Sequence, residues 1–154
     1  MPMQTKLIIS DTSCFIALSK IEALDILFML YKHIATTDEI AQEFGESLPE
    51  WVEIISVSDK TKQQLLEMQV DKGEASAIAL ALESENPFLI LDDHKARKLA
   101  RNLNLNHTGT IGVILAAKQK GIIPSIKPLL EKIKQTNFHL SPALELQALI
   151  QANE

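Results

Sequence analysis

Short apolar runs alternate with helix-forming segments along this chain, and two of the runs stop abruptly at acidic residues. Residues 7–9 (Leu-Ile-Ile) lead into Ser10-Asp11, and residues 88–91 (Phe-Leu-Ile-Leu) lead into Asp92-Asp93. A helix-forming segment follows each run, so both regions have the pattern of a strand, a turn and a helix. Repetition of this order predicts a parallel sheet with helices packed on both faces.

The other predicted elements continue the alternation. Further strands are expected at residues 34–36, 52–57 and 105–108, and further helices at 20–32, 37–44, 60–68, 74–83, 95–103, 110–120, 125–136 and 141–152. The segment 74–83 is apolar except at its ends, which predicts a helix buried on most sides. The last two helices form a helical C-terminal tail. No repeat or linker interrupts the order, so residues 1–154 are expected to form a single domain.

Composition sets outer limits on the fold and on the location of the protein. A length of 154 residues with 46% hydrophobic content supports one full core,. The one cysteine, Cys14, excludes an internal disulfide and a cysteine-based zinc site, and favours a reducing, cytoplasmic compartment,. No basic leader and no apolar stretch of roughly 18–20 residues occurs, so neither secretion nor membrane insertion is expected,.

Net charge excludes one class of nucleic-acid binding protein but does not by itself identify the function. A formal charge of -5 argues against an extended basic surface that binds nucleic acid through its phosphates alone,. It is compatible with a nucleic-acid enzyme whose acidic site is neutralised locally by divalent cations.

Five carboxylates are the candidate site residues: Asp11, Glu43, Glu74, Asp92 and Asp93. Because sites in open parallel sheets form outside the carboxyl ends of the strands, acids at those ends are expected to converge. A cluster of carboxylates without cysteine or clustered histidine prefers Mg²⁺ or Mn²⁺. Such ions suit the hydrolysis of phosphate esters.

Each acid also has a purely structural explanation. Asp11 is suited to capping the helix that follows it. Glu74 lies three residues after Asp71, the spacing of a capping box. Glu43 lies close to Glu39 on one helix, and the sequence does not say which of the two points inward. Asp92 and Asp93 repel each other, which a cation would relieve, but one of them is equally suited to capping the next helix.

Other chemistries lack their signatures. The chain has no G-x-S-x-G, Walker A, G-x-G-x-x-G or H-E-x-x-H motif, and the four histidines are dispersed without the spacing of ligands,. An aspartyl-nucleophile phosphatase would want a second aspartate where Ser13 stands. The basic residues Lys95, Arg97, Lys98 and Arg101 follow Asp92-Asp93 closely. They either hold a phosphate backbone or form a solvated helix face.

Several of these motifs together resemble the PIN-domain nuclease superfamily, and more narrowly its small, VapC-like, DUF3368-type branch. They are Ile9-Ser10-Asp11-Thr12-Ser13, Lys72-Gly73-Glu74-Ala75, Leu91-Asp92-Asp93 with Arg97 and Arg101, and Gly109-Thr110-Ile111-Gly112-Val113. The resemblance covers residues 7–145. It implies a Rossmann-like three-layer α/β/α sandwich and a Mg²⁺- or Mn²⁺-dependent ribonuclease, often a homodimer and often the toxin of a toxin-antitoxin pair.

The resemblance also assigns roles to residues. Asp11 matches the first acid of the family, Glu43 the acid on the helix after the second strand, and Glu74 the acid that opens the central helix. Either Asp92 or Asp93 matches the acid after the fourth strand, and Thr12 or Ser13 matches the hydroxyl beside the first acid. Two departures are Glu74 in place of the commoner Asp, and Leu91-Asp92-Asp93 in place of Thr-x-Asp.

The sequence therefore predicts an endoribonuclease. Asp11, Glu74 and Asp93 hold the ion, Glu43 assists them, and the cations Lys95, Arg97 and Lys98 position RNA. A non-catalytic module that binds RNA or protein is the main alternative, and a phosphatase of small substrates is a third. The apolar helices 20–32 and 143–152 either cover a dimer or antitoxin surface or pack in the core.

Overall fold

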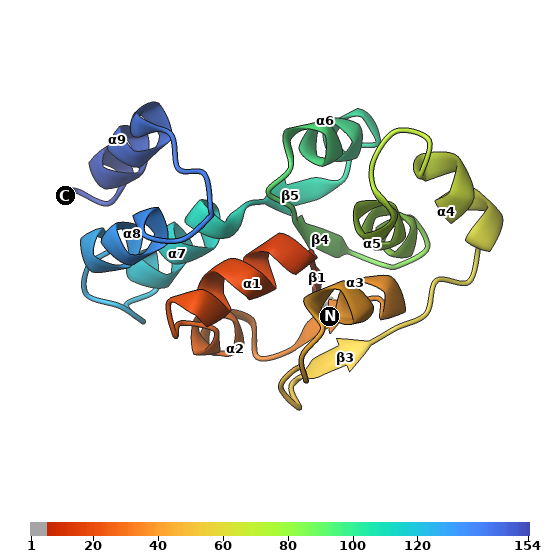
Figure 1. Cartoon of the computed structure of the whole chain (residues 1–154), viewed down its shortest axis with the longest axis horizontal. Coiled ribbons are helices and arrows are strands. Elements are labelled where there is room, and N and C mark those ends of the chain that lie inside the picture. The colour runs from red at the N-terminus through yellow and green to blue at the C-terminus, as the bar shows by residue number, and fades with distance from the viewer. Residues whose placement is uncertain (1–5) are drawn as a thin grey trace, which may run out of the picture.

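Five parallel strands form one central sheet in the computed structural model, which describes residues 6–154 (Figure 1). The strands are β1 (Leu7–Ser10), β2 (Ile34–Thr36), β3 (Val52–Ile54), β4 (Pro87–Ile90) and β5 (Asn106–Thr108). Their order across the sheet is β3-β2-β1-β4-β5. The chain therefore starts in the centre, builds one half of the sheet and returns to build the other, which creates a switch point between β1 and β4.

Helices cover both faces of this sheet, as the alternation of elements predicts. They are α1 (Thr12–Lys20), α2 (Asp25–Tyr31), α3 (Asp38–Phe44), α4 (Lys60–Leu66), α5 (Lys72–Leu82), α6 (His94–Asn102), α7 (Thr110–Gln119), α8 (Lys127–Lys134) and α9 (Pro142–Gln151). Helix α5 packs against β1 and β4, whereas α1 and α2 pack with α7 on the other side (Figure 1). The α/β sandwich with a parallel sheet is confirmed.

The helix starts follow from capping residues that the sequence carries. Thr37, Asp59 and Ser141 each accept a hydrogen bond from a backbone amide in the first turn of α3, α4 and α9. Gly45 ends α3 with a φ of 76°, a left-handed conformation that glycine adopts without steric cost,. These local signals explain why the predicted and observed helix starts agree closely.

Two predicted elements differ from the structure. The segment 20–32 is not one helix, because α1 continues to Lys20 and a turn with Glu22 at a φ of 57° precedes α2. The strand predicted at 52–57 ends at Ile54. Its neighbour β2 stops at Thr36, whose carbonyl accepts the last amide hydrogen bond from Ile55. Residues 56–57 therefore have no residue of β2 opposite them with which to extend the strand.

The core lies between the sheet and both helical layers. Residues of β1, β4 and α5 are almost fully buried, including Ile9, Leu89 and Ile78. Helix α5 is buried along most of its length, as its apolar sequence predicts. No helix in the described range 6–154 is long and apolar enough to cross a membrane.

The C-terminal helices are attached to the sandwich by polar contacts as well as by packing. Lys134 of α8 lies 2.8 Å from the Oε2 atom of Glu145 on α9. After α9, the Glu154 carboxylate accepts hydrogen bonds from the backbone amides of Ile126 and Lys127 and from the Lys118 ammonium. These contacts hold α8 and α9 together and join the end of α9 to α7 and to the start of α8.

We expect Ile78→Ala to reduce the free energy of unfolding by about 2–5 kcal/mol, because it leaves a cavity in a fully buried layer,. Leu65→Ala on the exposed face of α4 should change it by less than about 0.5 kcal/mol,. Urea denaturation of both variants measures the difference. Equal losses would contradict the assignment of α5 to the core.

Candidate metal and substrate site

Asp11 joins the two strand ends at the centre of the sheet. Its side chain is 3% exposed, and Ser10, just before it, pairs with Ile90 of β4. The Oδ1 atom accepts a hydrogen bond from the Cys14 amide at 2.9 Å, which caps α1, and Oδ2 accepts from the Asp92 amide at 3.0 Å. The capping explanation for Asp11 is therefore confirmed. The same carboxylate also connects the turn after β1 with the turn after β4.

Asp92 and Asp93 have different environments. Asp92 is half-buried, and its two oxygens accept hydrogen bonds from the backbone amide of Thr110 at 2.7 Å and from the Thr110 hydroxyl at 2.5 Å. Asp93 is exposed and caps α6, because its Oδ2 atom accepts from the Ala96 amide at 3.0 Å. Asp92 therefore lies beside Asp11. Asp93 is exposed at the start of α6 and lines neither of the two hollows described below.

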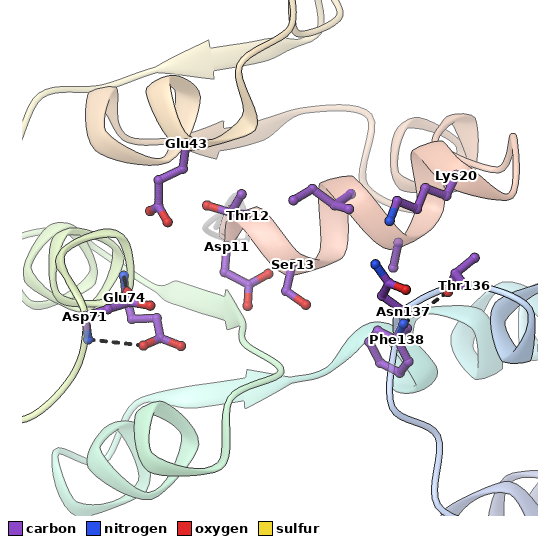
Figure 2. A pocket seen from close by; sticks show the side chains of 12 residues that line it. Asp11, Thr12, Ser13, Lys20, Glu43, Asp71, Glu74, Thr136, Asn137 and Phe138 are labelled. Carbon is purple, nitrogen blue, oxygen red and sulfur yellow. Dashed lines mark hydrogen bonds between the residues drawn. The ribbon is translucent and has the colours of Figure 1, made fainter.

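Glu74 and Asp71 form the predicted capping box at the start of α5. The Asp71 carboxylate accepts from the Glu74 amide at 2.9 Å, and the Glu74 carboxylate accepts from the Asp71 amide at 3.3 Å. Both side chains also line the cavity that contains Asp11 (Figure 2). The capping role and a place at the site are compatible.

Glu43 points into the same cavity, whereas Glu39 does not line it. The Glu39 carboxylate instead accepts a hydrogen bond from the Gln63 side chain at 2.5 Å, between α3 and α4. The Glu43 carboxylate lies over Gly73, where a Cβ atom would collide with its Oε1 atom. Gly73 thus leaves the space that the Glu43 side chain occupies at the start of α5.

The cavity measures about 340 Å³ and has two chemically different ends. Figure 2 shows Glu43, Asp71 and Glu74 at one end and Lys20, Asn137 and Phe138 at the other, with Asp11, Thr12 and Ser13 between them. Its volume falls within the roughly 300–1,000 Å³ typical of ligand sites. The predicted residues Asp11, Thr12, Ser13, Glu43 and Glu74 therefore meet in one cavity.

A second hollow of about 330 Å³ is lined by two of the predicted site residues that lie outside the first cavity. Asp92 and Arg97 line it together with His139 and Gln147. Arg97 is half-buried, and its Nη1 atom lies 3.2 Å from the position of a Cβ on Gly109, so a larger residue there would press on it. Lys95 and Lys98 are exposed on α6 and line neither hollow.

The acids at this edge raise one another's pKa. Burial raises the pKa of Asp11 well above its usual value, and the negative charges of Asp92 and Glu74 raise it further against its two amide hydrogen bonds,. Burial, together with Asp71 and Asp93, raises the pKa of Glu74 to about 7. Burial and Asp71 raise that of Glu43, while a hydrogen bond from Thr12 lowers it. This electrostatic cost is what a bound cation would remove.

Comparison with known protein families identifies the family to which this fold belongs. The family model DUF3368, described as a PIN domain, matches residues 7–154. The chain belongs to this PIN-domain family. A comparison with curated protein sequences gives no match. The predicted PIN resemblance is confirmed, and PIN domains are generally nucleases that use divalent metals.

The acids of this PIN domain fit a divalent metal in their chemistry. Carboxylate oxygens are hard ligands, and each Asp11 oxygen accepts one hydrogen bond and retains capacity for a second contact,. Nevertheless, within residues 6–154 no three acidic, histidine or cysteine side chains gather closely enough to form a metal-holding group. The donors are present at one edge, and binding would require their side chains to turn toward a common point.

Seven residues that line the acidic cavity were not among the predicted site residues: Ile16, Ala17, Lys20, Asp71, Thr136, Asn137 and Phe138. The sequence did indicate a place for Asp71 at the site, because its position three residues before Glu74 put both residues at the same helix start. Lys20 had only its position in the last turn of α1. Asn137 and Phe138 lie in the connection between α8 and α9, far from Asp11 in sequence, and carry no local signal for a place at the site.

Gly73→Ala tests the contact between α3 and α5. In a Glu43→Ala background, we expect the new methyl group to stabilise α5 by up to about 1 kcal/mol, because alanine favours helix over glycine. In the wild-type background, the displaced Glu43 side chain should reduce or reverse this gain. A double-mutant cycle of unfolding free energies measures the coupling. An identical effect in both backgrounds would show that Glu43 does not occupy this space.

Stability without metal should depend on Glu74. The folded-state pKa of Glu74 is raised from 4.5 to about 7, so its protonated carboxyl favours the folded state. The stability that this carboxyl contributes is fully present below pH 4.5 and is lost as the pH rises through about 7,. Glu74→Gln keeps the capping-box acceptor but cannot ionise. In EDTA, we expect the difference in unfolding free energy between Glu74→Gln and the wild type to rise by about 1 kcal/mol from pH 4.5 to pH 8. The figure allows for a half-exposed carboxyl.

Urea denaturation at several pH values measures this gain, and Glu50→Gln at an exposed position outside the cavity serves as the control. A pH-independent difference between Glu74→Gln and the wild type would contradict the proposed cause.

Proposed function

We propose that this PIN domain is a metal-dependent endoribonuclease. The observation that supports it best is the placement of a buried Asp11 carboxylate, fixed by two backbone amides, in a cavity with Glu43, Asp71 and Glu74. A cavity rich in carboxylates repels a bare phosphate, so a cation is the natural intermediary between this site and a nucleic acid.

Asp11, Glu74 and Asp93 would hold Mg²⁺ or Mn²⁺. Asp92 lies beside them, because its backbone amide donates a hydrogen bond to the Asp11 carboxylate. When bound, such an ion polarises a phosphodiester and activates a water molecule for in-line attack. Its contribution depends on the rigid position of Asp11, because the amides of Cys14 and Asp92 fix both carboxylate oxygens.

The remaining roles fall to residues around the acids. Glu43 assists at the same end of the cavity, where the Thr12 hydroxyl lowers the pKa of its carboxylate. The Ser13 hydroxyl lines the passage between the two ends. Arg97 in the neighbouring hollow, with Lys95 and Lys98 on the exposed surface of α6, would bind the phosphates of RNA,.

A catalytically inactive module that binds RNA or protein is the second candidate. It is favoured by the separation of the acids, since no three of them gather as a metal-holding group in the described part of the chain. Under the main proposal, the protein would further be the toxin of a toxin-antitoxin pair, a VapC-like homodimer, located in the cytoplasm.

Cleavage of a mixed panel of labelled RNAs should occur in Mn²⁺ or Mg²⁺ and stop in EDTA. Asp11→Asn should reduce kcat/KM by a factor of about 100 or more, because it removes charge at the centre of the site. The matched control is Asp25→Asn, which changes an exposed aspartate on α2 and should retain wild-type activity.

The outcomes separate the two candidates. Cleavage that survives Asp11→Asn would indicate a contaminating nuclease and would contradict the proposal. RNA binding without cleavage in either metal would instead favour the inactive module.

A further inference from the structure

Phe138 lines both hollows at the site. It borders the acidic cavity beside Asn137 and also borders the hollow that contains Asp92 and Arg97. Among the described residues, no other one borders both of these hollows. It is also the only Phe, Tyr or Trp that lines either of them in residues 6–154, while the imidazole of His139 lines the second hollow. Phe138 therefore borders the cavity of Glu43, Asp71 and Glu74 as well as the hollow of Arg97.

The backbone at Phe138 is fixed. Its amide donates a hydrogen bond to the Thr136 hydroxyl at 3.2 Å, and that hydroxyl donates to the Ile133 carbonyl at the end of α8 at 2.7 Å. The ion pair between Lys134 and Glu145 holds the helices on either side of this connection together. The ring is half-buried and packs against the hydrophobic core, and the rest of its surface is exposed to a ligand.

Part of the lining of the acidic cavity is apolar. Ile16 and Ala17, which lie between Ser13 and Lys20 on α1, line it, and Ile16 is 37% exposed although it is a large hydrophobic residue. Asn137 supplies an amide group that both donates and accepts hydrogen bonds,. Figure 2 shows Asn137 and Phe138 across the cavity from Glu43 and Glu74. An apolar surface, an aromatic ring and one amide are the groups that bind a nucleobase.

We propose that Phe138 and Asn137 form a nucleobase subsite. One base of the RNA lies on the ring of Phe138 and against Ile16, and the Asn137 side chain contacts the edge of that base. The adjoining phosphates then lie toward the acids on one side and Arg97 on the other. This inference rests on the proposed function, because it assumes that RNA is the substrate and says that one of its bases binds at the end of the cavity that contains Asn137 and Phe138.

Phe138 also packs against the hydrophobic core, so loss of the ring could act through structure alone. The conservative variant separates the two roles. Tyrosine keeps a stacking ring, whereas leucine keeps apolar packing without an aromatic face. A base subsite requires Tyr to restore binding where Leu does not.

The test is the dissociation constant for short single-stranded RNAs, each lacking the base at one position. It is measured in Ca²⁺, a hard cation that neutralises the carboxylates, and in EDTA for comparison. For the wild type, we expect one abasic position to weaken binding roughly 5- to 100-fold, the range of base stacking on an aromatic side chain. Phe138→Leu should weaken binding of the intact RNA by a similar factor and should no longer distinguish that abasic RNA. Phe138→Tyr and the control Phe28→Leu on the exposed face of α2 should behave as the wild type.

The subsite would be overturned if the wild type binds no RNA, if no abasic position matters, or if Phe138→Leu retains the wild-type sensitivity. Its failure is distinguishable from failure of the nuclease. Metal-dependent cleavage that Phe138→Leu and abasic substitution leave unchanged would remove the subsite alone. Base-dependent binding by a protein that cleaves no RNA in either metal would remove the nuclease alone.

Discussion

The buried carboxylate of Asp11 is the contact on which the arrangement of the site depends. One of its oxygens begins α1 and the other holds the turn after β4, so a single side chain fixes two segments that are 81 residues apart. The central strands make this possible, because Ser10 and Ile90 pair in register and end together. Asp11, Thr12 and Ser13 in the middle of the acidic cavity are positioned by this pair of strand ends.

The energetic consequence is an accumulation of negative charge in a partly desolvated place. Burial is the largest cause of the raised pKa of Asp11 and of Glu74, and neighbouring carboxylates add to it in both cases. A buried charge without a compensating partner is costly, so such a cluster is retained at the expense of stability. Family membership gives this cost a reason, since PIN domains are generally nucleases that use divalent metals.

Local sequence signals predicted most of the fold and part of the site. The apolar runs, the capping residues Thr37, Asp59 and Ser141, and Gly45 act within a few residues of themselves, and the structure agrees with them. The carboxyl ends of parallel strands are also close by geometry, which made the meeting of Asp11 with Asp92 predictable. The family resemblance selected Glu43, but the residue pattern alone left Glu39 and Glu43 open. Their orientation depends on the packing of α3 against α5 and on the hydrogen bond between Glu39 and Gln63 of α4. The same holds for Phe138, whose position depends on contacts between α7, α8 and α9.

The affinity of the Asp11 site for a divalent cation is the most direct test of the central claim. Thermal unfolding should be measured with and without Mn²⁺ at about 100 times its dissociation constant, for the wild type and for Asp11→Asn. The account predicts that Mn²⁺ raises the Tm of the wild type by about 5–10 °C and leaves that of Asp11→Asn nearly unchanged. An equal shift in both proteins, or none in the wild type, would contradict a metal centre at Asp11.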